Sequence, residues 1–535
     1  MRIDRRTALK GAMAGAATLA APGFIPAAAQ GRRETLLVVS ENAPNSTDIH
    51  GVGANRPAYE ASWNVYDRLM TFGVKKDERG NDHYDYEKLE PELAEEWDLR
   101  PMSVTFKLRR NARFHDGTPV TAQDVKWSFD RAVTVGGFPT FQMGAGSLER
   151  REQFVVVDDH TFRVDFIRRD KLTMPDLAVP VPVIINSALA RRNATEQDPW
   201  AMNWLRSNPA GSGAFRMERW VPGQEMVFVR NDQWASGPRP ALARVIWRIV
   251  PQAGNRRALL ERGDADLSFD LPPKDFQELQ QSRRLKIVST PVENALNYLG
   301  MNVVRGPFAD VRVRRAVALA LPYERIMEQA MFGQGTPMFG GPAEPASATW
   351  PQPAPFATNL ERARALMAEA GQANGFDTTL SFDLGTATVS EPAALAIAEN
   401  LGRIGIRVTI NKIPGANWRN ELLKKELPLF LNGFGGWLNF PDYFFYWAYH
   451  SQDAIFNTSS YKNPAMDALI DRSRFEEDRA AYEAAIRGFV MLAWQDVPRV
   501  PIFQPWLNVA MQNSINGYRY WFHRQLDYRT LSKTA

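Results

Sequence analysis

The sequence of 535 residues contains no cysteine and only six histidines. Without cysteine the chain has no disulfide, no thiolate nucleophile, no iron–sulfur cluster and no residue to which a lipoprotein anchor could be attached. No two histidines have the close spacing of a metal motif such as His-Glu-x-x-His, and there is no Gly-x-Ser-x-Gly elbow. We therefore expect no cofactor and no metal, and a binding protein rather than an enzyme.

The sequence also lacks a surplus of one charge. The formal net charge is +4, but residues 1–29 hold four basic side chains against Asp4 alone, so the rest of the chain carries only about +1. Binding to a phosphate backbone needs a concentration of Lys and Arg on one face, and no such stripe is present. We expect no nucleic-acid partner.

No apolar run reaches the roughly 20 residues that a membrane span needs. The N-terminus instead has a charged region with Arg5, Arg6 and Lys10, an Ala/Gly-rich apolar region, and the small residues 27–29 before Gln30. This order is typical of an export signal over residues 1–29, and the paired arginines resemble a twin-arginine signal. The general secretory route and an uncleaved anchor are the alternatives, and we expect a periplasmic protein.

What the sequence does contain is strands alternating with helices. Runs at 34–39, 104–109, 226–229, 379–382 and 407–410 are rich in β-branched and aromatic residues, whereas 59–72, 313–321 and 360–370 have helical spacing of apolar residues. Thr121 and Asp124 suit the start of a further helix. At this length the chain should divide into two or three domains, and the alternation predicts α/β lobes.

Several motifs carry a resemblance to a known family. The most specific is the stretch from Leu93-Ala-Glu-Glu-Trp97 through Phe114-His-Asp-Gly-Thr-Pro119 to Val125, followed by Gly211-Ser-Gly-Ala-Phe215, Asn231-Asp-Gln-Trp234, Gly263-Asp-Ala-Asp266 and Tyr298-Leu-Gly-Met-Asn302. Their kind and order resemble the solute-binding family of the dipeptide, oligopeptide and nickel importers, often called family 5. The resemblance spans nearly the whole chain after the signal.

This resemblance implies an α/β, two-lobed periplasmic-binding-protein fold of type II, with an extra domain in the first half. Lobe I would comprise residues 30–62, 208–289 and 503–535, the additional domain residues 63–207, and lobe II residues 290–502. The hinge crossings would fall near 290–297 and 500–504. The implied function is that of a monomeric subunit of an ABC importer, which closes over a solute and delivers it to a permease of the inner membrane.

The resemblance also places residues in the solute site. Peptide-binding members carry an Asp for the solute's amino group where this chain has Asn439, and dipeptide-binding members carry an Arg for the carboxylate near the position of Thr388. An Asn supplies no charge to a buried ammonium, so both differences point away from a short zwitterionic peptide. Asp442 either takes over the pairing or shapes the turn.

Further candidates are aromatic and amide side chains. Trp437 and Tyr443 are assigned to the cleft because flat rings suit sugars and partly apolar solutes, whereas residues 444–447 have the spacing of core residues. Asn42, Asn45 and Asn297 are candidate solute contacts, although an Asn in a loop often only satisfies turn backbone.

The class of solute stays open between a peptide, a sugar, an opine-like conjugate and a nickel complex. His450, just after the aromatic stretch, is the one histidine that a nickel complex would use. A secreted carbohydrate-active enzyme is the alternative function, but it needs two convergent carboxylic acids that the sequence alone does not show.

Overall fold

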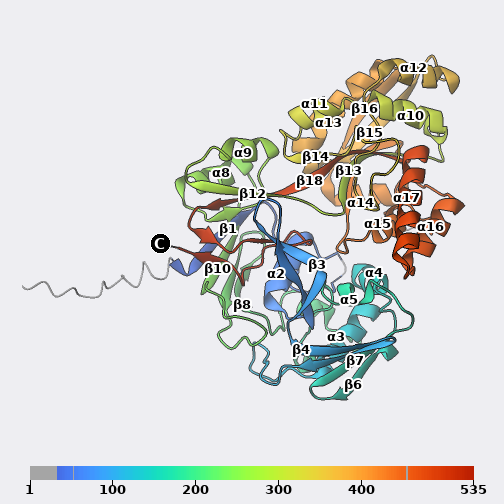
Figure 1. Cartoon of the computed structure of the whole chain (residues 1–535). Coiled ribbons are helices and arrows are strands. Elements are labelled where there is room, and N and C mark those ends of the chain that lie inside the picture. Colours follow the sequence, from blue (N-terminus) through green and yellow to red (C-terminus); the bar gives the residue numbers. More distant parts are fainter. Residues whose placement is uncertain (1–32, 52, 453–455, 535) are drawn as a thin grey trace, which may run out of the picture.

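The computed structural model describes residues 33–51, 53–452 and 456–534. The predicted export signal, 1–29, lies outside this range. Two large hydrophobic cores organise the chain: the first is built mainly from residues 36–267 and 509–531, and the second from residues 296–503. We call the parts around them the first lobe and the second lobe, and Figure 1 shows the second lobe at the upper right. The domain bounds given above remain predictions.

The first lobe begins with a sheet and then receives a long insertion. Its own elements are β1 (Thr35–Ser40), α2 (Arg56–Val65), β8 (Phe215–Val221), β9 (Glu225–Arg230), β10 (Arg244–Ile249), α8 (Ala253–Arg262), β11 (Leu267–Ser268), α9 (Pro273–Leu279) and β12 (Leu285–Pro291). The insertion holds β2 (Met70–Lys76), β3 (Asp82–Pro91), β4 (Ala94–Arg100), β5 (Ser103–Leu108), α3 (Ala122–Thr134), α4 (Gly137–Ala145), η1 (Arg151–Gln153), β6 (Phe154–Asp158), β7 (Thr161–Asp165), α5 (Thr173–Asp176), α6 (Ser187–Arg192) and α7 (Met202–Leu205).

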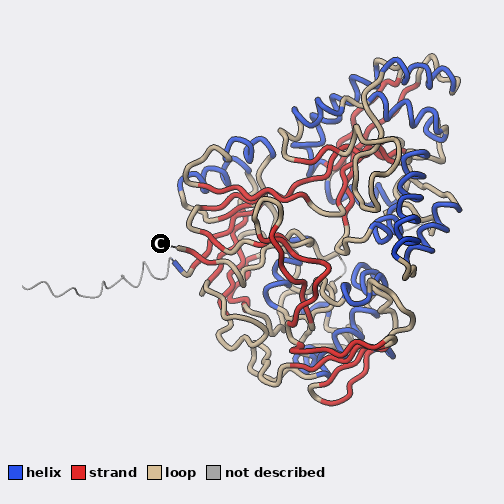
Figure 2. The backbone as a smooth tube through the Cα atoms, in the orientation of Figure 1, coloured by secondary structure: helices blue, strands red, loops and turns tan. Residues whose placement is uncertain are grey.

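The second lobe is a mixed sheet with helices around it (Figure 2). Its elements are β13 (Ala295–Met301), η2 (Pro307–Ala309), α10 (Val311–Ala320), α11 (Tyr323–Gln329), β14 (Gly335–Pro337), α12 (Leu360–Glu369), β15 (Phe376–Asp383), η3 (Leu384–Thr386), α13 (Ala387–Gly402), β16 (Ile406–Ile413), α14 (Gly415–Lys424), β17 (Leu429–Gly435), α15 (Pro441–Ala448), α16 (Pro464–Arg474) and α17 (Arg479–Asp496). The chain then returns to the first lobe with β18 (Arg499–Gln512), β19 (Ile515–Asn516), β20 (Arg519–Tyr520) and β21 (Ser532–Lys533).

Strand β18 joins the two lobes. Its first half pairs with β13 and β14 of the second lobe, and its second half pairs with β11 and β12 of the first. The strand order is therefore continuous, β16-β15-β17-β13-β18-β11-β1-β10-β9-β8. Strands β15 and β16 run parallel, as do β1 and β10, whereas β13 and β17 run antiparallel. The mixture of parallel pairs with covering helices confirms the predicted α/β class.

Helix α2 is shorter than the sequence pattern predicts. The expected helix over 59–72 begins earlier, because Asn55 caps the free N–H of Ala58 and Pro57 occupies the first turn. It ends at Val65, whose carbonyl accepts the N–H of Gly213, and residues 70–76 form β2 instead. A Cβ on Gly211 would lie 2.1 Å from the same carbonyl oxygen, so tertiary packing of a glycine turn ends the helix. The predicted start of α3 is confirmed by a capping box between Thr121 and Asp124.

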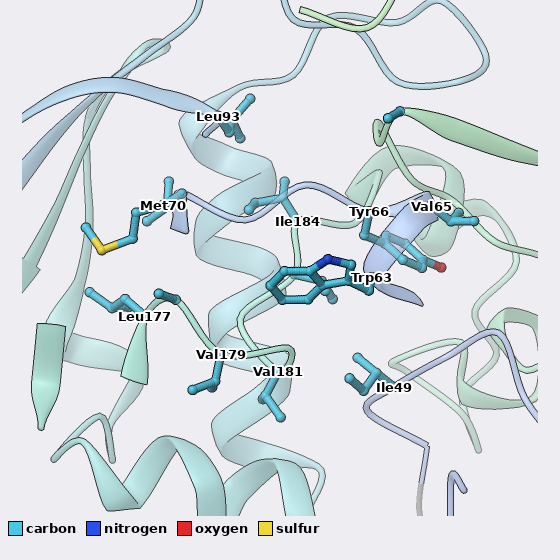
Figure 3. Packing of buried hydrophobic residues seen from close by; sticks show 14 of the residues in the cluster. Ile49, Trp63, Val65, Tyr66, Met70, Leu93, Leu177, Val179, Val181 and Ile184 are labelled. Atoms are coloured by element: carbon cyan, nitrogen blue, oxygen red, sulfur yellow. The ribbon is translucent and has the colours of Figure 1, made fainter. Parts of the chain in front are cut away.

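The insertion shares its core with the first lobe. In Figure 3 Trp63 of α2 lies among Val181 and Ile184 of the insertion, with Ile49 from the loop after β1 nearby, and each is at most 1% exposed. Burial on this scale packs the insertion and the first lobe into one core. No helix in the described part of the chain is both long enough and apolar enough to span a bilayer.

Candidate solute-binding cleft

A cavity of about 1170 Å³ lies between the lobes. The first lobe lines it with the loop before α2, the start of α9 and the second half of β18, and the insertion adds the first turns of α4. The second lobe lines it with β13, β17 and the beginning of α13. Any solute of matching size would touch both lobes and the hinge strand between them.

Glycines at the end of β17 form the floor of the cavity. A Cβ on Gly433 would lie 2.9 Å from Asn297 Oδ1, and one on Gly435 would lie 2.9 Å from Arg524 Nη2. A Cβ on Gly436 would lie 2.2 Å from Tyr443 Cε1. The missing side chains therefore let Asn297, Arg524 and Tyr443 lie directly over the backbone of this strand.

An aromatic wall crosses from one lobe to the other. Trp437, which follows β17, packs edge-on against Tyr59 of α2 with ring centroids 5.2 Å apart, and against Phe138 of α4 at 4.9 Å. The hydroxyl of Tyr443 donates to Gln142 Oε1 at 2.9 Å. Trp437 and Tyr443 belong to the first core although their chain segment belongs to the second lobe. This conformation thus has the segment after β17 docked onto the first lobe.

The charged groups that line the cavity fall into two kinds. The carboxylates have protein partners: Asp270 accepts the N–H of Glu41 at 2.9 Å, Glu41 lies 3.4 Å from Arg256, and Asp383 accepts the N–H of Gly385. Burial raises the pKa of Asp270, although that N–H and the charge of Arg256 oppose the rise. The second kind is four arginines that also line the cavity, of which Arg256 has the contact with Glu41 and the others are Arg56, Arg419 and Arg524.

A comparison with family models shows the family to which the chain belongs. Residues 88–456 match the model of the bacterial extracellular solute-binding proteins, family 5 (middle). The chain belongs to this family. The predicted resemblance and the two-lobed binding-protein fold are thereby confirmed, and the function of the protein is to bind a solute.

Curated relatives match over most of their length. The chain is 27% identical over 491 residues to the probable D,D-dipeptide-binding periplasmic protein DdpA of Escherichia coli, covering 90% of this chain and 91% of that one. It is 26% identical over 499 residues to the oligopeptide-binding protein AppA of Bacillus subtilis, covering 87% and 86%.

Solved structures show the same fold. The periplasmic binding protein DppA of Helicobacter pylori, in complex with the peptide STSA, matches with a TM-score of 0.79 at 22% identity and covers 94% of this chain and 98% of that one. The binding protein AgaA of A. tumefaciens R10, in complex with agropinic acid, matches with a TM-score of 0.77 at 24% identity and covers 94% and 99%.

Four of the eight candidate residues named from the sequence line the cavity: Asn297, Thr388, Trp437 and Tyr443. Asn297 lies on β13 and Thr388 at the start of α13, so both approach from the second lobe. As solute contacts these four stay predictions. Phe444 and Phe445 are buried in the second core, at 1% and 0% exposure, as their helical spacing indicated.

Asn439 and Asp442 do not line the cavity. The Nδ2 of Asn439 donates to Glu293 Oε2 at 2.6 Å, so its amide is engaged at the interface of the lobes. Asp442 has no exposed surface: it accepts the hydroxyl of Tyr482 at 2.6 Å and lies 3.3 Å from Lys171 Nζ. Burial raises the pKa of its carboxyl, and the charge of Lys171 partly opposes this. In this conformation neither residue lines the cavity, and as solute contacts both stay predictions.

Asn42 and Asn45 also lie away from the cavity lining. Asn45 Nδ2 donates to the carbonyl of Gly53 at 2.9 Å, and its Oδ1 accepts the N–H of Asn55. Asn45 thus stabilises the loop in which Gly53 lines the cavity. Hydrogen bonding to the backbone of a turn is a common role of Asn. Asn42 is exposed, and the hydroxyl of Ser40 donates to its carbonyl. His450 lies 3.2 Å from Asp471 and is likewise absent from the lining residues.

Sequence reasoning missed Arg56, Tyr59, Arg419 and Arg524. Arg56 and Tyr59 stand in the first turn of α2, where the sequence Asn-Arg-Pro signals a helix start but gives no sign of a ligand. Arg524 lies in an irregular segment near the C-terminus, and only the return of the chain through β18 brings it to the cavity. No local pattern could have found it.

Proposed function

We propose that this protein is the periplasmic solute-binding subunit of an ABC importer, which closes its lobes over a small solute and delivers it to a membrane permease. The supporting observation is the cavity of about 1170 Å³ whose lining comes from both lobes. A solute that touches both lobes binds the closed form more tightly than the open one, and so shifts the population to the closed form. A permease can then distinguish loaded from empty protein.

The solute we propose is peptide-like or another small molecule with polar groups and apolar surface. The relatives are named for D,D-dipeptides, oligopeptides and glutathione, and the solved complexes hold a peptide or agropinic acid. In this chain the aromatic wall of Tyr59, Phe138 and Trp437 offers flat apolar surface, and the glycine floor exposes backbone groups. The volume exceeds that of common pockets for drug-sized ligands, about 300–1000 Å³.

A thermal-shift screen of the protein from Gln30 onward tests this function. The panel contains di- to pentapeptides, oligosaccharides, opine-like conjugates and nickel complexes. A solute at 100 times its Kd adds about 2.7 kcal/mol to the free energy of unfolding, which raises the melting temperature measurably. Each hit is then measured by small-angle X-ray scattering, where closure lowers the radius of gyration. A hit that leaves the radius unchanged contradicts capture by hinge closure.

The variant Trp437→Ala separates this cavity from any other. Trp437 contacts both α2 and α4, so its loss removes apolar contact surface for the solute and one contact between the lobes. We expect solute affinity to fall about tenfold or more. Trp220→Ala is the control, because Trp220 borders a different and smaller depression. Equal losses in both variants would contradict the assignment of the solute to the large cavity.

The alternative of a carbohydrate-active enzyme has less support. The chain belongs to a family of binding proteins, and the cavity carboxylates Glu41, Asp270 and Asp383 already contact protein groups. Incubation of each oligosaccharide with the protein, followed by chromatography, tests it: accumulating product would establish an enzyme, whereas stoichiometric binding without product supports capture.

We also propose that residues 1–29 direct export and that the protein acts as a monomer. Mass spectrometry of the protein from a periplasmic extract should show a chain that begins near Gln30. Replacing Arg5 and Arg6 by Lys should block export if the twin-arginine route is used and leave it unchanged if the general route is used. Light scattering of the purified protein should give the mass of one chain.

A further inference from the structure

His83 of β3 presents both nitrogens of its ring to hydrogen-bond acceptors. Nδ1 lies 2.6 Å from the carbonyl oxygen of Tyr84, and Nε2 lies 3.5 Å from Oε1 of Glu293. A carbonyl and a carboxylate oxygen only accept hydrogen bonds, and a neutral imidazole carries a single N–H. The neutral ring therefore satisfies one of these two contacts, whereas the protonated ring satisfies both. Because His83 is only 5% exposed, solvent supplies little compensation for a missing donor.

The carboxylate that His83 faces lies at the hinge and has partners on both sides of it. Glu293 stands between β12 of the first lobe and β13 of the second. Its Oε2 accepts the hydroxyl of Tyr84 at 2.7 Å and the Nδ2 of Asn439 at 2.6 Å. The next residue, Asn294, donates its side-chain amide to the carbonyl of Leu438. The carboxylate of Glu293 thus joins β3 of the insertion to the segment after β17.

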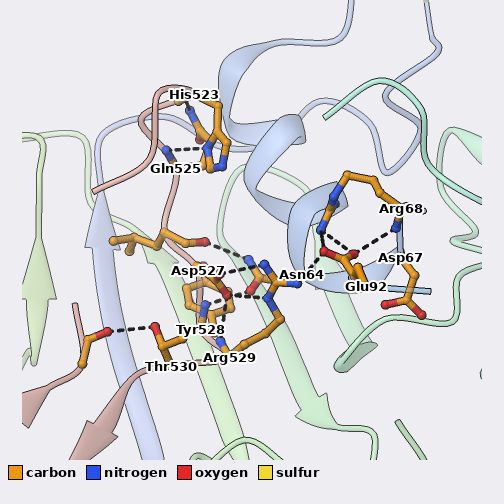
Figure 4. Close-up of polar contacts among 12 residues, drawn as sticks. Asn64, Asp67, Arg68, Glu92, His523, Gln525, Asp527, Tyr528, Arg529 and Thr530 are labelled. Atoms are coloured by element: carbon orange, nitrogen blue, oxygen red, sulfur yellow. Dashed lines mark hydrogen bonds and ion pairs between the residues drawn. The ribbon is translucent and has the colours of Figure 1, made fainter. Parts of the chain in front are cut away.

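A buried ion-pair network fixes the strand that carries His83 to the first lobe (Figure 4). Glu92, the residue after β3, lies 2.8 Å from Arg68 and 3.2 Å from Arg529. Arg529 also pairs with Asp527 at 2.7 Å, in the C-terminal segment that follows β20. Strand β20 itself pairs with the start of β3, next to His83. His83 is therefore expected to move with the first lobe when the lobes open.

The other side of this contact belongs to the second lobe. Asn439 lies between β17 and α15, so a rotation at the hinge carries it away from β3 and strains the carboxylate that both parts share. A protonated His83 attracts the carboxylate of Glu293 and keeps it where Asn439 reaches it. The lone pair of a neutral ring repels the same carboxylate, which weakens the connection between the lobes.

Each element packed against His83 adds charged or titratable groups. Besides Glu293, these groups are Lys75 of β2, Asp77 of the turn between β2 and β3, Asp82, Tyr84 and Asp85 of β3, and Arg519 and Tyr520 of β20. Lys75 pairs with Asp85 at 3.6 Å, and Asp82 pairs with Lys76 at 2.7 Å. Burial, and then the charge of Glu293, raise the pKa of Tyr84, so its hydroxyl stays a donor. Histidine is the side-chain type whose charge changes between about pH 5 and 8.

We infer that His83 and Glu293 form a proton-binding site that couples closure of the lobes to pH, with the closed form favoured when His83 is protonated. Because the closed form binds this proton more tightly than the open form, the ratio of closed to open protein falls as the pH rises. A hydrogen bond to a charged group corresponds to a change of about tenfold in this ratio. The inference goes beyond the proposed function, since it concerns the protein without solute.

The absence of cysteine allows two spin labels to be placed at chosen positions, one on each side of the cavity. Gln123, in the first turn of α3, and Ala468, on α16, are exposed. The labelled protein carries Gln123→Cys and Ala468→Cys, each with a nitroxide. Pulsed electron paramagnetic resonance at about pH 5 and 8, at constant ionic strength and without solute, gives the populations of short and long distances. Circular dichroism at each pH checks that the protein is folded.

Two variants of His83 separate a proton-dependent role from a merely structural one. His83→Gln keeps an N–H group that is able to donate to Glu293 at every pH, whereas His83→Phe keeps a ring and has no N–H. The control His160→Gln removes another histidine of the insertion, between β6 and β7. We expect the ratio of closed to open protein to be about tenfold higher at pH 5 than at pH 8 in the labelled wild type and in the control. In both His83 variants the ratio should be independent of pH, and it should be higher for Gln than for Phe.

An equal ratio at both pH values in the labelled wild type overturns the inference. A wild-type pH dependence in both His83 variants also overturns it, because another group at the interface of the lobes would then be responsible. If neither variant folds, Glu293→Gln carries the test and should lose most of the pH dependence. A solute hit together with closure that is independent of pH leaves the proposed function standing, whereas pH-dependent closure without any solute hit leaves the proton site standing.

Discussion

The amide of Asn439 and the hydroxyl of Tyr84 both donate to one oxygen of Glu293, at 2.6 and 2.7 Å. This contact links the segment after β17 to β3 of the insertion and to the hinge region. A residue in the expected position of the amine-binding Asp thus has a different task in this chain. In this conformation it holds two parts of the protein together.

Replacing Asn439 by Asp should destabilise the protein and leave affinity for amine-bearing solutes unchanged. The new carboxylate would face Glu293, so a hydrogen bond of about 1 kcal/mol is lost and a like-charge repulsion is added. Asn439→Ala is the control, since it loses only the hydrogen bond. The melting temperature should be lower for Asp than for Ala, and the difference should shrink in high salt. Tighter binding of an amine ligand by the Asp variant would contradict the observed placement.

Gly436 makes room for the ring of Tyr443. With a Cβ only 2.2 Å from Cε1, Gly436→Ala must displace the ring and break its hydrogen bond to Gln142, at a cost of about 1–3 kcal/mol. Gly402→Ala is the matched control, because a Cβ there meets nothing within 4 Å and the residue lies in α13. Thermal unfolding should show a loss for position 436 and no loss for position 402. Similar melting temperatures would mean that the segment after β17 adjusts freely.

Among the elements, α2 depends most on the C-terminal segment. Its Glu60 is fully buried and accepts the hydroxyl of Tyr528 and, at 3.4 Å, the N–H of Leu526. Burial raises the pKa of Glu60 to about 8, although both hydrogen bonds oppose the rise. The carboxyl is therefore neutral in the folded protein at a pH where the unfolded chain has lost the proton.

The sign of the resulting pH dependence follows from the raised pKa. The contribution of Glu60 to stability is fully present below about pH 4.5 and is lost as the pH rises towards 8, because the unfolded state then binds fewer protons. In Glu60→Gln this loss cannot occur. The melting temperature of the variant minus that of the wild type should therefore increase between pH 4.5 and 8. The other titrating groups are the same in both proteins, so their contributions cancel in this difference. A difference independent of pH would contradict the raised pKa.

On the scale of the whole molecule, polar contacts hold the insertion to the second lobe. Arg474, at the end of α16, lies 2.9 Å from Asp170 and also donates to the carbonyl of Ala145. Lys171 donates to the carbonyl of Ser473 at 2.5 Å and pairs with Asp442. These contacts join the insertion to the second lobe, so opening of the lobes would break them.

Arg474→Met should favour the open form and weaken solute binding about tenfold, because affinity falls with the population of the competent state. Arg472→Met is the control, because exposed Arg472 lies two residues before Arg474 on α16 and, in the described part of the chain, pairs only with half-buried Glu476. Small-angle scattering without solute should give a larger radius of gyration for the first variant only. Unchanged scattering and affinity would show that these contacts do not contribute to closure.

Much of the fold was predictable because its signals are local. Capping residues, side-chain periodicity and turn residues close together in the chain predict several elements. These are the helix capped by Thr121, the strands around Val104 and Val227, and the alternation after Val311. The end of α2 was not predictable from local sequence, because Gly211 and Gly213, which terminate the helix, lie far away in the chain. The residues of the candidate site show the same difference. Trp437 was predictable because it follows a glycine-rich strand end, whereas no neighbouring residues in the sequence indicate that Arg524 lines the cavity.

The sequence by itself determined the class of protein, because the kind and order of its motifs resemble those of the family whose model residues 88–456 match. The tertiary structure decided which side chains line the cavity. Asn439 is held away from the cavity by Glu293, which lies more than a hundred residues earlier in the chain. Asp442 is held away by Tyr482, about forty residues later. Arg56 and Arg524 were brought together across more than four hundred residues, because only the path of β18 returns the chain to α2.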